Sequence, residues 1–135
     1  MSDLQYLICT IDRNNKRLFK KEANMRKLIS IDLDGVLNNY DGNYNETKLP
    51  EIKQGAKNFL QKLSENYRIE IFTTRNIKMT VLWLIENGLI QYVENVSNVK
   101  NQFSSVFVDD RAINFDGDLE EVYQKIIEFR PYWKK

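Results

Sequence analysis

Histidine is absent from this chain of 135 residues, and cysteine occurs once, at Cys9. Without histidine, Ser-His-Asp catalysis and metal sites with imidazole ligands are excluded. A single cysteine excludes a disulfide within the chain and a zinc site built from several thiolates. Cys9 lies in an apolar run, which favours a buried strand thiol over a nucleophile. Any catalysis must therefore use carboxylates, Lys, Thr, Tyr or Arg, and any bound metal should be a hard cation that prefers oxygen ligands.

An excess of charge of either sign is also missing. The chain has 20 Lys and Arg residues and 19 Asp and Glu residues, so its formal net charge is +1. This balance disfavours nucleic acid as a partner. The apolar stretches are too short to span a membrane, and the N-terminal residues lack the apolar centre of a signal peptide. We therefore expect a cytoplasmic protein that has no membrane attachment and folds around one core.

Residues 1–24 differ in pattern from the rest of the chain. Residues 4–11 predict a strand, 12–15 a turn and 16–20 a polar second strand. A β-hairpin at a sheet edge and a poorly ordered arm are the two alternatives for this segment. We interpret residues 1–24 as an N-terminal extension, and residues 25–135 as the core domain.

Four short apolar segments in the core domain predict β-strands, at residues 28–32, 68–72, 92–96 and 105–108. The first of them is apolar on both faces apart from Ser30, as expected of a central parallel strand. Helical segments separate the strands. The chain therefore predicts an α/β domain with a doubly wound, Rossmann-like and mostly parallel sheet that is flanked by helices.

Three segments show the apolar spacing of amphipathic helices. The first is predicted to begin at Pro50, the second is capped by Asn76 and stopped by Gly88, and the third begins with the capping-box pair Asp118 and Glu121. Their apolar stripes are Ile52, Ala56, Phe59, Leu60 and Leu63 in the first, Ile77, Val81, Leu84 and Ile85 in the second, and Leu119, Val122, Tyr123, Ile126 and Ile127 in the third.

Carboxylates follow two of the predicted strands. Asp32 and Asp34 come at the end of the first strand, and Asp109 and Asp110 directly follow the last. Either pair alone is explained by a solvated acidic turn. Because the carboxyl ends of parallel strands meet at one edge of a sheet, we expect the two pairs to lie together. Such a cluster favours a divalent cation with oxygen ligands.

The order of the polar residues resembles the haloacid dehalogenase superfamily, and specifically its phosphatases. The resemblance covers residues 27 to about 129. It is carried by the motif Asp-Leu-Asp-Gly-Val-Leu at 32–37, then Thr73, then Lys100, then Asp109-Asp110. The stretch from Val106 to Phe115 is also similar to a small branch of that superfamily, in which proline usually follows the lysine. Here Asn101 takes that place.

The resemblance implies a Mg²⁺-dependent hydrolase of phosphate monoesters. Asp32 would be the nucleophile that forms an aspartyl phosphate, and Asp34 the general acid and base. The acid at position 34 is what distinguishes phosphatases from dehalogenases and ion pumps in the superfamily. Mg²⁺ would bind Asp32, Asp109 and the main-chain carbonyl of Asp34, with Asp110 either a further ligand or an anchor for the others. Thr73 and Lys100 would hold the phosphoryl oxygens, with Thr74 as the alternative to Thr73.

The site should be open, because fifteen residues between Asp34 and Pro50 and twenty-six between Thr73 and Lys100 leave no room for a cap domain. The substrate is then a small phosphorylated metabolite or a macromolecule, and a second subunit of a homo-oligomer could cover the site.

A receiver domain is disfavoured, because there the lysine follows the acids. The alternative function is a non-catalytic module that binds a phosphate ligand. We expect Tyr40, Tyr44, Arg75 and Arg111 near the substrate.

Overall fold

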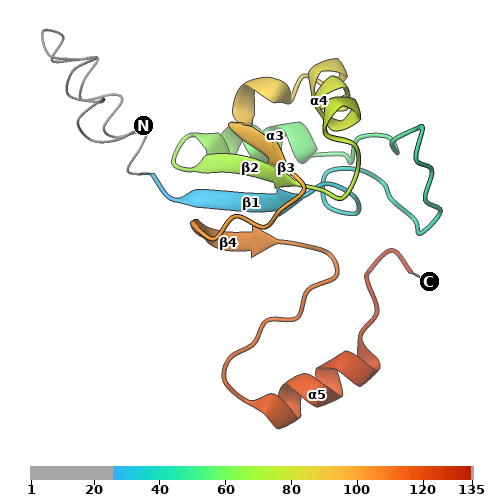
Figure 1. The fold of residues 1–135 in the computed structure, drawn as a ribbon, viewed down its shortest axis with the longest axis vertical. Coiled ribbons are helices and arrows are strands. Elements are labelled where there is room, and N and C mark those ends of the chain that lie inside the picture. The colour runs from blue at the N-terminus through green and yellow to red at the C-terminus, as the bar shows by residue number, and fades with distance from the viewer. Residues whose placement is uncertain (1–25, 135) are drawn as a thin grey trace, which may run out of the picture.

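The structure, a computed structural model, describes residues 26–134 (Figure 1). The predicted hairpin in residues 1–24 and the strand around Cys9 lie outside the described residues. Within the described part of the chain, no helix has the length and apolar character needed to cross a membrane. The elements in chain order are β1 (Leu28–Asp32), α3 (Ala56–Ser64), β2 (Arg68–Phe72), α4 (Ile77–Glu86), η1 (Ile90–Tyr92), β3 (Asn95–Ser97), β4 (Ser104–Val108) and α5 (Leu119–Glu128).

The four strands form one sheet in the order β3-β2-β1-β4, and every pair of neighbours is parallel. This confirms the prediction of a Rossmann-like α/β fold with a parallel sheet. The chain moves outward from β1 to β2 and β3, and then crosses back to place β4 on the other side of β1. In open α/β sheets such a reversal of direction marks the usual ligand site, outside the carboxyl ends of the strands. Here that place is the end of β1 and β4.

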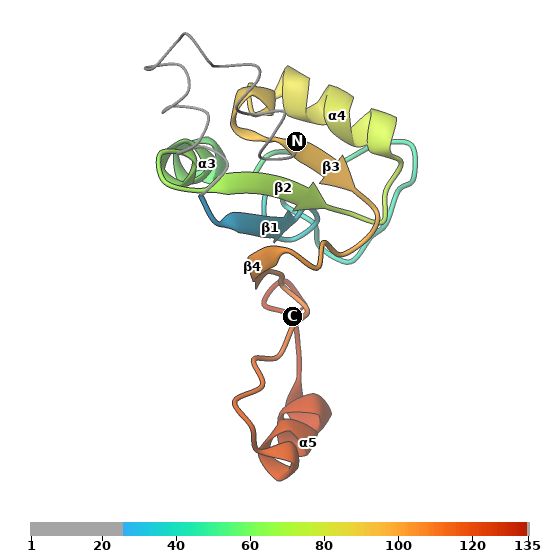
Figure 2. The same ribbon diagram turned by 60° about the vertical axis from the view of Figure 1, so that its left-hand side comes forward.

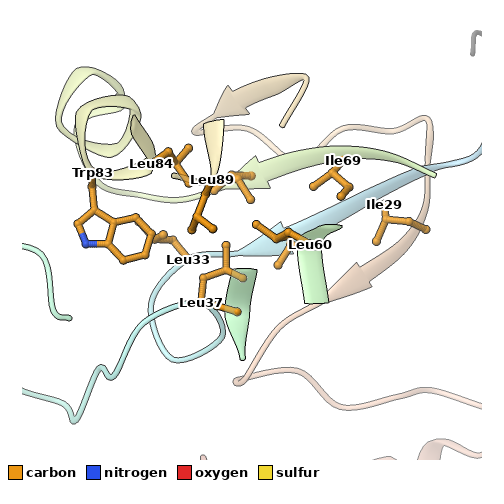
Figure 3. Packing of buried hydrophobic residues seen from close by; sticks show 11 residues of the cluster. Ile29, Leu33, Leu37, Leu60, Ile69, Trp83, Leu84 and Leu89 are labelled. Carbon is orange, nitrogen blue, oxygen red and sulfur yellow. The ribbon is translucent and has the colours of Figure 1, made fainter. Parts of the chain in front are cut away.

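One face of the sheet carries the core. Ile31 of β1 and Ile71 of β2 are fully buried and belong to one apolar cluster with residues of α3 and α4. Ile29 and Ile69, two positions earlier on the same strands, belong to it as well and are labelled in Figure 3. Leu60 enters this cluster from α3, and Leu84 enters it from α4. The alternation follows from the strand period of two, which sends every second side chain to the same face. Packing of this face therefore fixes the positions of β1 and β2.

The first predicted helix begins later than the sequence pattern indicated. Pro50 was expected to open it, but α3 begins at Ala56. Residues 51–53 instead run antiparallel to residues 37–39, with a bridge between Asn38 and Ile52. Gly55, which has a φ of 88°, then turns the chain into the helix. The pairing with a distant segment satisfies the backbone of residues 51–53 and prevents an earlier start.

The second helix has the predicted cap but presents a different inner face. The side chain of Asn76 accepts a hydrogen bond of 3.1 Å from the backbone N–H of Met79, as the pattern predicted. Apolar residues occur on several sides of α4, so their spacing could not fix its rotation. The indole N–H of Trp83 donates to the carbonyl of Pro50 at 3.0 Å, which turns this side inward. The buried residues of α4 are Thr80, Trp83 and Leu84, whereas Ile77 and Ile85 are 41% and 52% exposed.

The last strand and the last helix are more exposed than predicted. β4 contains the apolar run Val106-Phe107-Val108, yet Val106 is 50% and Phe107 is 43% exposed. α5 has its predicted cap, in which Asp118 accepts a hydrogen bond of 3.0 Å from the N–H of Glu121. However, no residue of α5 is buried, and both views show the helix standing away from the sheet (Figure 1, Figure 2). The chain runs from the end of β4 away from the sheet to α5, and the residues after α5 run back, so that Trp133 contacts Asp110 at the end of β4.

Two leucines of α4 allow a direct test of this packing. Leu84 is fully buried, whereas Leu82 is 49% exposed on the same helix. Replacing Leu84 with Ala should lower the free energy of unfolding by about 3 kcal/mol, because it removes buried methyl groups and leaves a cavity. Leu82→Ala should cost less than about 1 kcal/mol. Denaturant unfolding of both variants measures the difference, and equal losses would contradict the observed rotation of α4.

Candidate active site

Three carboxylates meet at the carboxyl edge of the sheet. Asp32 ends β1, and Asp109 and Asp110 follow β4 on the neighbouring strand. One carboxylate oxygen from each of the three lies within 4.8 Å of the others. We call Asp32, Asp109 and Asp110 the acidic triad. The parallel pairing of β1 with β4 brings Asp32 and Asp109 together, although they are 77 positions apart in the sequence.

The acidic triad is electrostatically unfavourable on its own. Burial, a hydrogen bond between the side chains of Asp32 and Asp110, and the negative charges of Asp109 and Asp110 together raise the pKa of Asp32 to about 8. Oδ1 of Asp110 is buried and has no hydrogen-bond partner among the described residues. Closely spaced carboxylates with an unpartnered oxygen fit a hard divalent cation, which prefers oxygen ligands and would offset the repulsion.

The side chain of Asp34 binds other partners and is not a member of the acidic triad. Its Oδ2 accepts a hydrogen bond of 2.7 Å from Nε of Arg75, whose side chain is only 2% exposed. Its Oδ1 accepts one of 3.0 Å from the side-chain amide of Asn38. The carboxylate of Asp34 is therefore held by two donors and is not part of the triad. The metal contact expected for this residue was through its main-chain carbonyl, which does not require the side chain to reach the triad.

Asn38 is a site residue that the sequence pattern did not reveal. Its side chain is fully buried. Its Oδ1 accepts hydrogen bonds from the backbone N–H groups of Gly35, at 3.1 Å, and Tyr40, at 3.2 Å. Together with the bond to Asp34, these contacts close the turn after β1. Gly35 has a φ of 81°, and a Cβ there would overlap the carboxylate of Asp110, so both the turn and the triad require glycine.

Thr73 and Arg75 lie at the end of β2, beside the turn. Thr73 is buried and its hydroxyl accepts a hydrogen bond of 3.1 Å from the N–H of Arg75, whereas Thr74 is exposed. Nη1 of Arg75 donates to the carbonyl of Asn45 at 2.7 Å, and the guanidinium lies 4.5 Å from the centre of the Tyr44 ring. Arg75 therefore connects Asp34 to the loop of residues 38–48.

Lys100 is not brought to the acidic triad. Its ammonium lies 5.4 Å from the centre of the Phe107 ring, and it forms no ion pair with any described carboxylate. The next residue explains this position, because the side-chain amide of Asn101 donates to Glu70 at 3.1 Å. Glu70 is a buried carboxylate of β2, so this bond ties the loop before β4 to the sheet. Arg111 is exposed, and its backbone N–H donates to Asp109 at 2.8 Å.

The C-terminal residues reach the site, which the sequence pattern also did not reveal. The indole N–H of Trp133 donates to Oδ2 of Asp110, and the hydroxyl of Tyr132 donates to the carbonyl of Gly35. The Trp133 ring also meets Tyr40 edge to face, with 5.0 Å between ring centres. Two adjacent aromatic residues in a polar terminus were the available signal for a docked segment.

A cleft of about 570 Å³ has none of the acidic triad among its lining residues. It is lined by residues 47–52 and by one side of α4.

Comparisons of the chain with protein-family models, with curated proteins and with solved structures found no match. The function of the site is therefore inferred from its residues, their geometry and the order of the motifs.

Asn38 offers a test of the turn that holds Asp34. Asn38→Asp removes the amide donor and places a second buried carboxylate against Asp34, so it should cost about 3 kcal/mol of unfolding free energy at neutral pH. Asn39→Asp is the matched control, because Asn39 is exposed and should lose less than about 1 kcal/mol. Chemical denaturation in the same buffer measures both. A harmless Asn38→Asp would contradict the role of this amide.

The raised pKa of Asp32 predicts a pH dependence of stability. The pKa of Asp32 is about 8 in the folded state, against an ordinary value of 3.8, so the folded protein keeps this proton to a higher pH than the unfolded chain does. In a chelating buffer, its contribution to stability is therefore fully present below pH 3.8 and is lost as the pH rises towards 8. Asp32→Asn should raise the melting temperature more at about pH 9 than at about pH 5.

The control for this comparison is Asp116→Asn, which changes an exposed carboxylate outside the acidic triad. Its melting temperature should follow that of the unmodified protein at both pH values. Thermal unfolding followed by circular dichroism gives the four differences. If Asp32→Asn and Asp116→Asn shifted the melting temperature equally at high pH, the repulsion within the triad would be refuted.

Proposed function

We propose that this protein is a Mg²⁺-dependent phosphatase that hydrolyses a phosphate monoester through an aspartyl phosphate on Asp32. The observation that carries the proposal is the acidic triad, formed at the carboxyl edge of a parallel sheet beside the point where the strand order reverses. The motif order, which resembles that of phosphatases of the haloacid dehalogenase superfamily, supports the same reaction. The absence of histidine and the single cysteine leave a carboxylate as the natural nucleophile.

The three residues of the acidic triad would hold the cation. Their oxygens are close enough to share one ion, and they are the ligand type that Mg²⁺ prefers. Bound there, Mg²⁺ would supply positive charge that lowers the repulsion between a carboxylate nucleophile and an anionic phosphate. The hydrogen bond from Trp133 reaches Asp110 from the C-terminal segment and restricts the orientation of its carboxylate.

The first step is carried by Asp32 and Asp34. An oxygen of Asp32 forms a bond to phosphorus while the bond from phosphorus to the leaving oxygen breaks. The leaving oxygen takes a proton from Asp34 and departs as an alcohol. Arg75 and Asn38 keep the Asp34 side chain in one place at the end of β1, two residues from the nucleophile.

The second step regenerates the enzyme. A water molecule forms a bond to phosphorus and gives a proton to Asp34, while the bond between phosphorus and the Asp32 oxygen breaks. Inorganic phosphate leaves, and both carboxyl groups return to their starting states. Thr73 and Lys100 would donate to the phosphoryl oxygens. Lys100 would then have to leave the Phe107 ring, a change that its long, exposed side chain permits.

A second candidate is a module that binds a phosphate ligand without turnover. The position of Lys100 favours it, because the ammonium lies on Phe107 and forms no ion pair with the described acids. The two candidates differ in one respect. Both would bind Mg²⁺ and phosphate, but only the phosphatase releases phosphate from a monoester.

Turnover should require both Mg²⁺ and Asp32. Release of phosphate from 4-nitrophenyl phosphate should be stimulated by Mg²⁺, stopped by a chelator and reduced more than about a thousandfold in Asp32→Asn, because the amide is a very poor nucleophile. Asp116→Asn, outside the triad, should retain full activity. Activity in Asp32→Asn that matches the unmodified protein would refute the nucleophile, and Mg²⁺ binding with no turnover would favour the binding module.

The role of Asp34 can be separated from that of Asp32 by the choice of leaving group. Asp34→Asn keeps the size of the side chain but cannot supply a proton. The first step should therefore slow by about a hundredfold or more with an alkyl phosphate, and much less with 4-nitrophenyl phosphate, whose leaving group needs little protonation. Single-turnover rates for both substrates measure this contrast. Equal losses would indicate that Asp34 is only structural.

A further inference from the structure

We propose that Tyr40, Tyr44 and Trp133 form an aromatic rim that selects a phosphate monoester whose leaving group carries an aromatic ring. This inference rests on the proposed function and adds the class of substrate. The three residues come from two distant parts of the chain, the loop of residues 38–48 and the C-terminal segment. Trp133 contacts Asp110 directly, and Tyr40 contacts Trp133. Tyr44 contacts Arg75, which binds Asp34.

Trp133 links the aromatic rim to the acidic triad. Its indole N–H donates to Asp110, and its ring lies edge to face against Tyr40 at 5.0 Å with an interplanar angle of 74°. A Cβ at Gly42 would come within 3.0 Å of the Trp133 ring, so the loop backbone packs closely against the indole. If the phosphate binds beside Asp110, the leaving group attached to it would lie next to the Trp133 ring.

Tyr44 and Arg75 supply the other part of the rim. Tyr44 is 57% exposed, although its ring lies 4.5 Å from the buried guanidinium of Arg75. Nη2 of Arg75 is buried and has no hydrogen-bond partner among the described residues, while Nε and Nη1 bind Asp34 and Asn45. A buried donor without a partner is unfavourable in the free protein, and it would be satisfied by an acceptor on a bound ligand.

The loop that presents the two tyrosines is already ordered by its own contacts. Asp41 accepts a hydrogen bond of 3.0 Å from the N–H of Asn43, and Asn45 accepts one of 2.9 Å from the N–H of Thr47. The hydrogen bond from Arg75 to Asn45 then fixes the loop to the end of β2. Rings held in this way lose little conformational freedom when a ligand stacks on them.

An aromatic leaving group fits this rim better than a sugar or a short alkyl chain. Tyr and Trp rings bind planar π systems by stacking and edge contacts, whereas polyols need several hydrogen-bonding side chains. The described segment 26–134 contains no inserted cap between its motifs, so the rim remains as a surface beside the acids that a leaving group would meet. Two sources share this chemistry, namely simple aryl or benzyl phosphates and nucleoside monophosphates.

The test uses pairs of substrates with matched leaving groups. Benzyl phosphate and cyclohexylmethyl phosphate both release a primary alcohol, and they differ mainly in the aromatic character of the ring. We expect kcat/KM for benzyl phosphate to be about tenfold higher. Adenosine 5'-monophosphate against ribose 5-phosphate makes the corresponding pair for nucleotides. A preference in one pair only identifies which of the two sources the aromatic rim accepts.

Variants separate stacking from the hydrogen bond to Asp110. Trp133→Phe keeps a ring but loses the N–H, so it should lower activity on both members of a pair and keep most of the preference. Trp133→Leu and Tyr40→Leu should reduce the preference to less than about threefold. Tyr123→Leu is the control, because Tyr123 is 58% exposed on α5 and should change neither rate.

The aromatic rim would be refuted by equal kcat/KM values within both substrate pairs, or by a preference that survives Trp133→Leu and Tyr40→Leu. A protein that hydrolyses none of these esters would refute the proposed phosphatase, and the rim would then be tested by binding. Benzylphosphonate and cyclohexylmethylphosphonate cannot be hydrolysed, and calorimetry with Mg²⁺ present compares their affinities. Tighter binding of the aromatic phosphonate, lost in Trp133→Leu, would support the rim, whereas equal affinities would overturn it.

Discussion

The repulsion among Asp32, Asp109 and Asp110 is the constraint on which the rest of the site depends. Parallel pairing of β1 with β4 forces these carboxylates together, and burial denies them the screening that water would give. The raised pKa of Asp32 is the direct consequence. The fold tolerates this cost because the apolar cluster beneath the sheet fixes β1 and its neighbours independently of the acids. A divalent cation would turn the same arrangement into a stabilising one.

Donors from other parts of the chain bind the carboxylates of the site, but no described Lys or Arg forms an ion pair with the acidic triad. Arg75 and Asn38 bind Asp34, and Trp133 binds Asp110. Asp32 instead shares its hydrogen bond with another carboxyl group. The polar network therefore orients the side chains around the triad and leaves negative charge at its centre. The loop of residues 38–48 and the C-terminal segment belong to this network, so the elements that orient the acids also carry the rings proposed to select the substrate.

Local signals in the sequence predicted the parts of the structure that depend on neighbouring residues. The bounds of β1 and β2 and the caps at Asn76 and Asp118 follow from strand patterns and short-range hydrogen bonds. The start of α3 and the rotation of α4 depend on contacts with distant segments, which periodicity does not encode. The apolar stripe of α5 predicts an amphipathic helix but does not say whether another element covers it. The same reason explains why Asn38 and Trp133 were missed: their roles depend on a buried turn and on a chain end that returns to it.

The central claim is that the acidic triad binds a divalent cation, and calorimetric titration with Mg²⁺ tests it most directly. The account predicts that one equivalent of Mg²⁺ binds, and that binding is lost in Asp109→Asn, which removes a ligand charge without removing bulk. Asp116→Asn, on an exposed site outside the triad, should bind Mg²⁺ as the unmodified protein does. Absence of binding in the unmodified protein, or undiminished affinity in Asp109→Asn, would contradict the account.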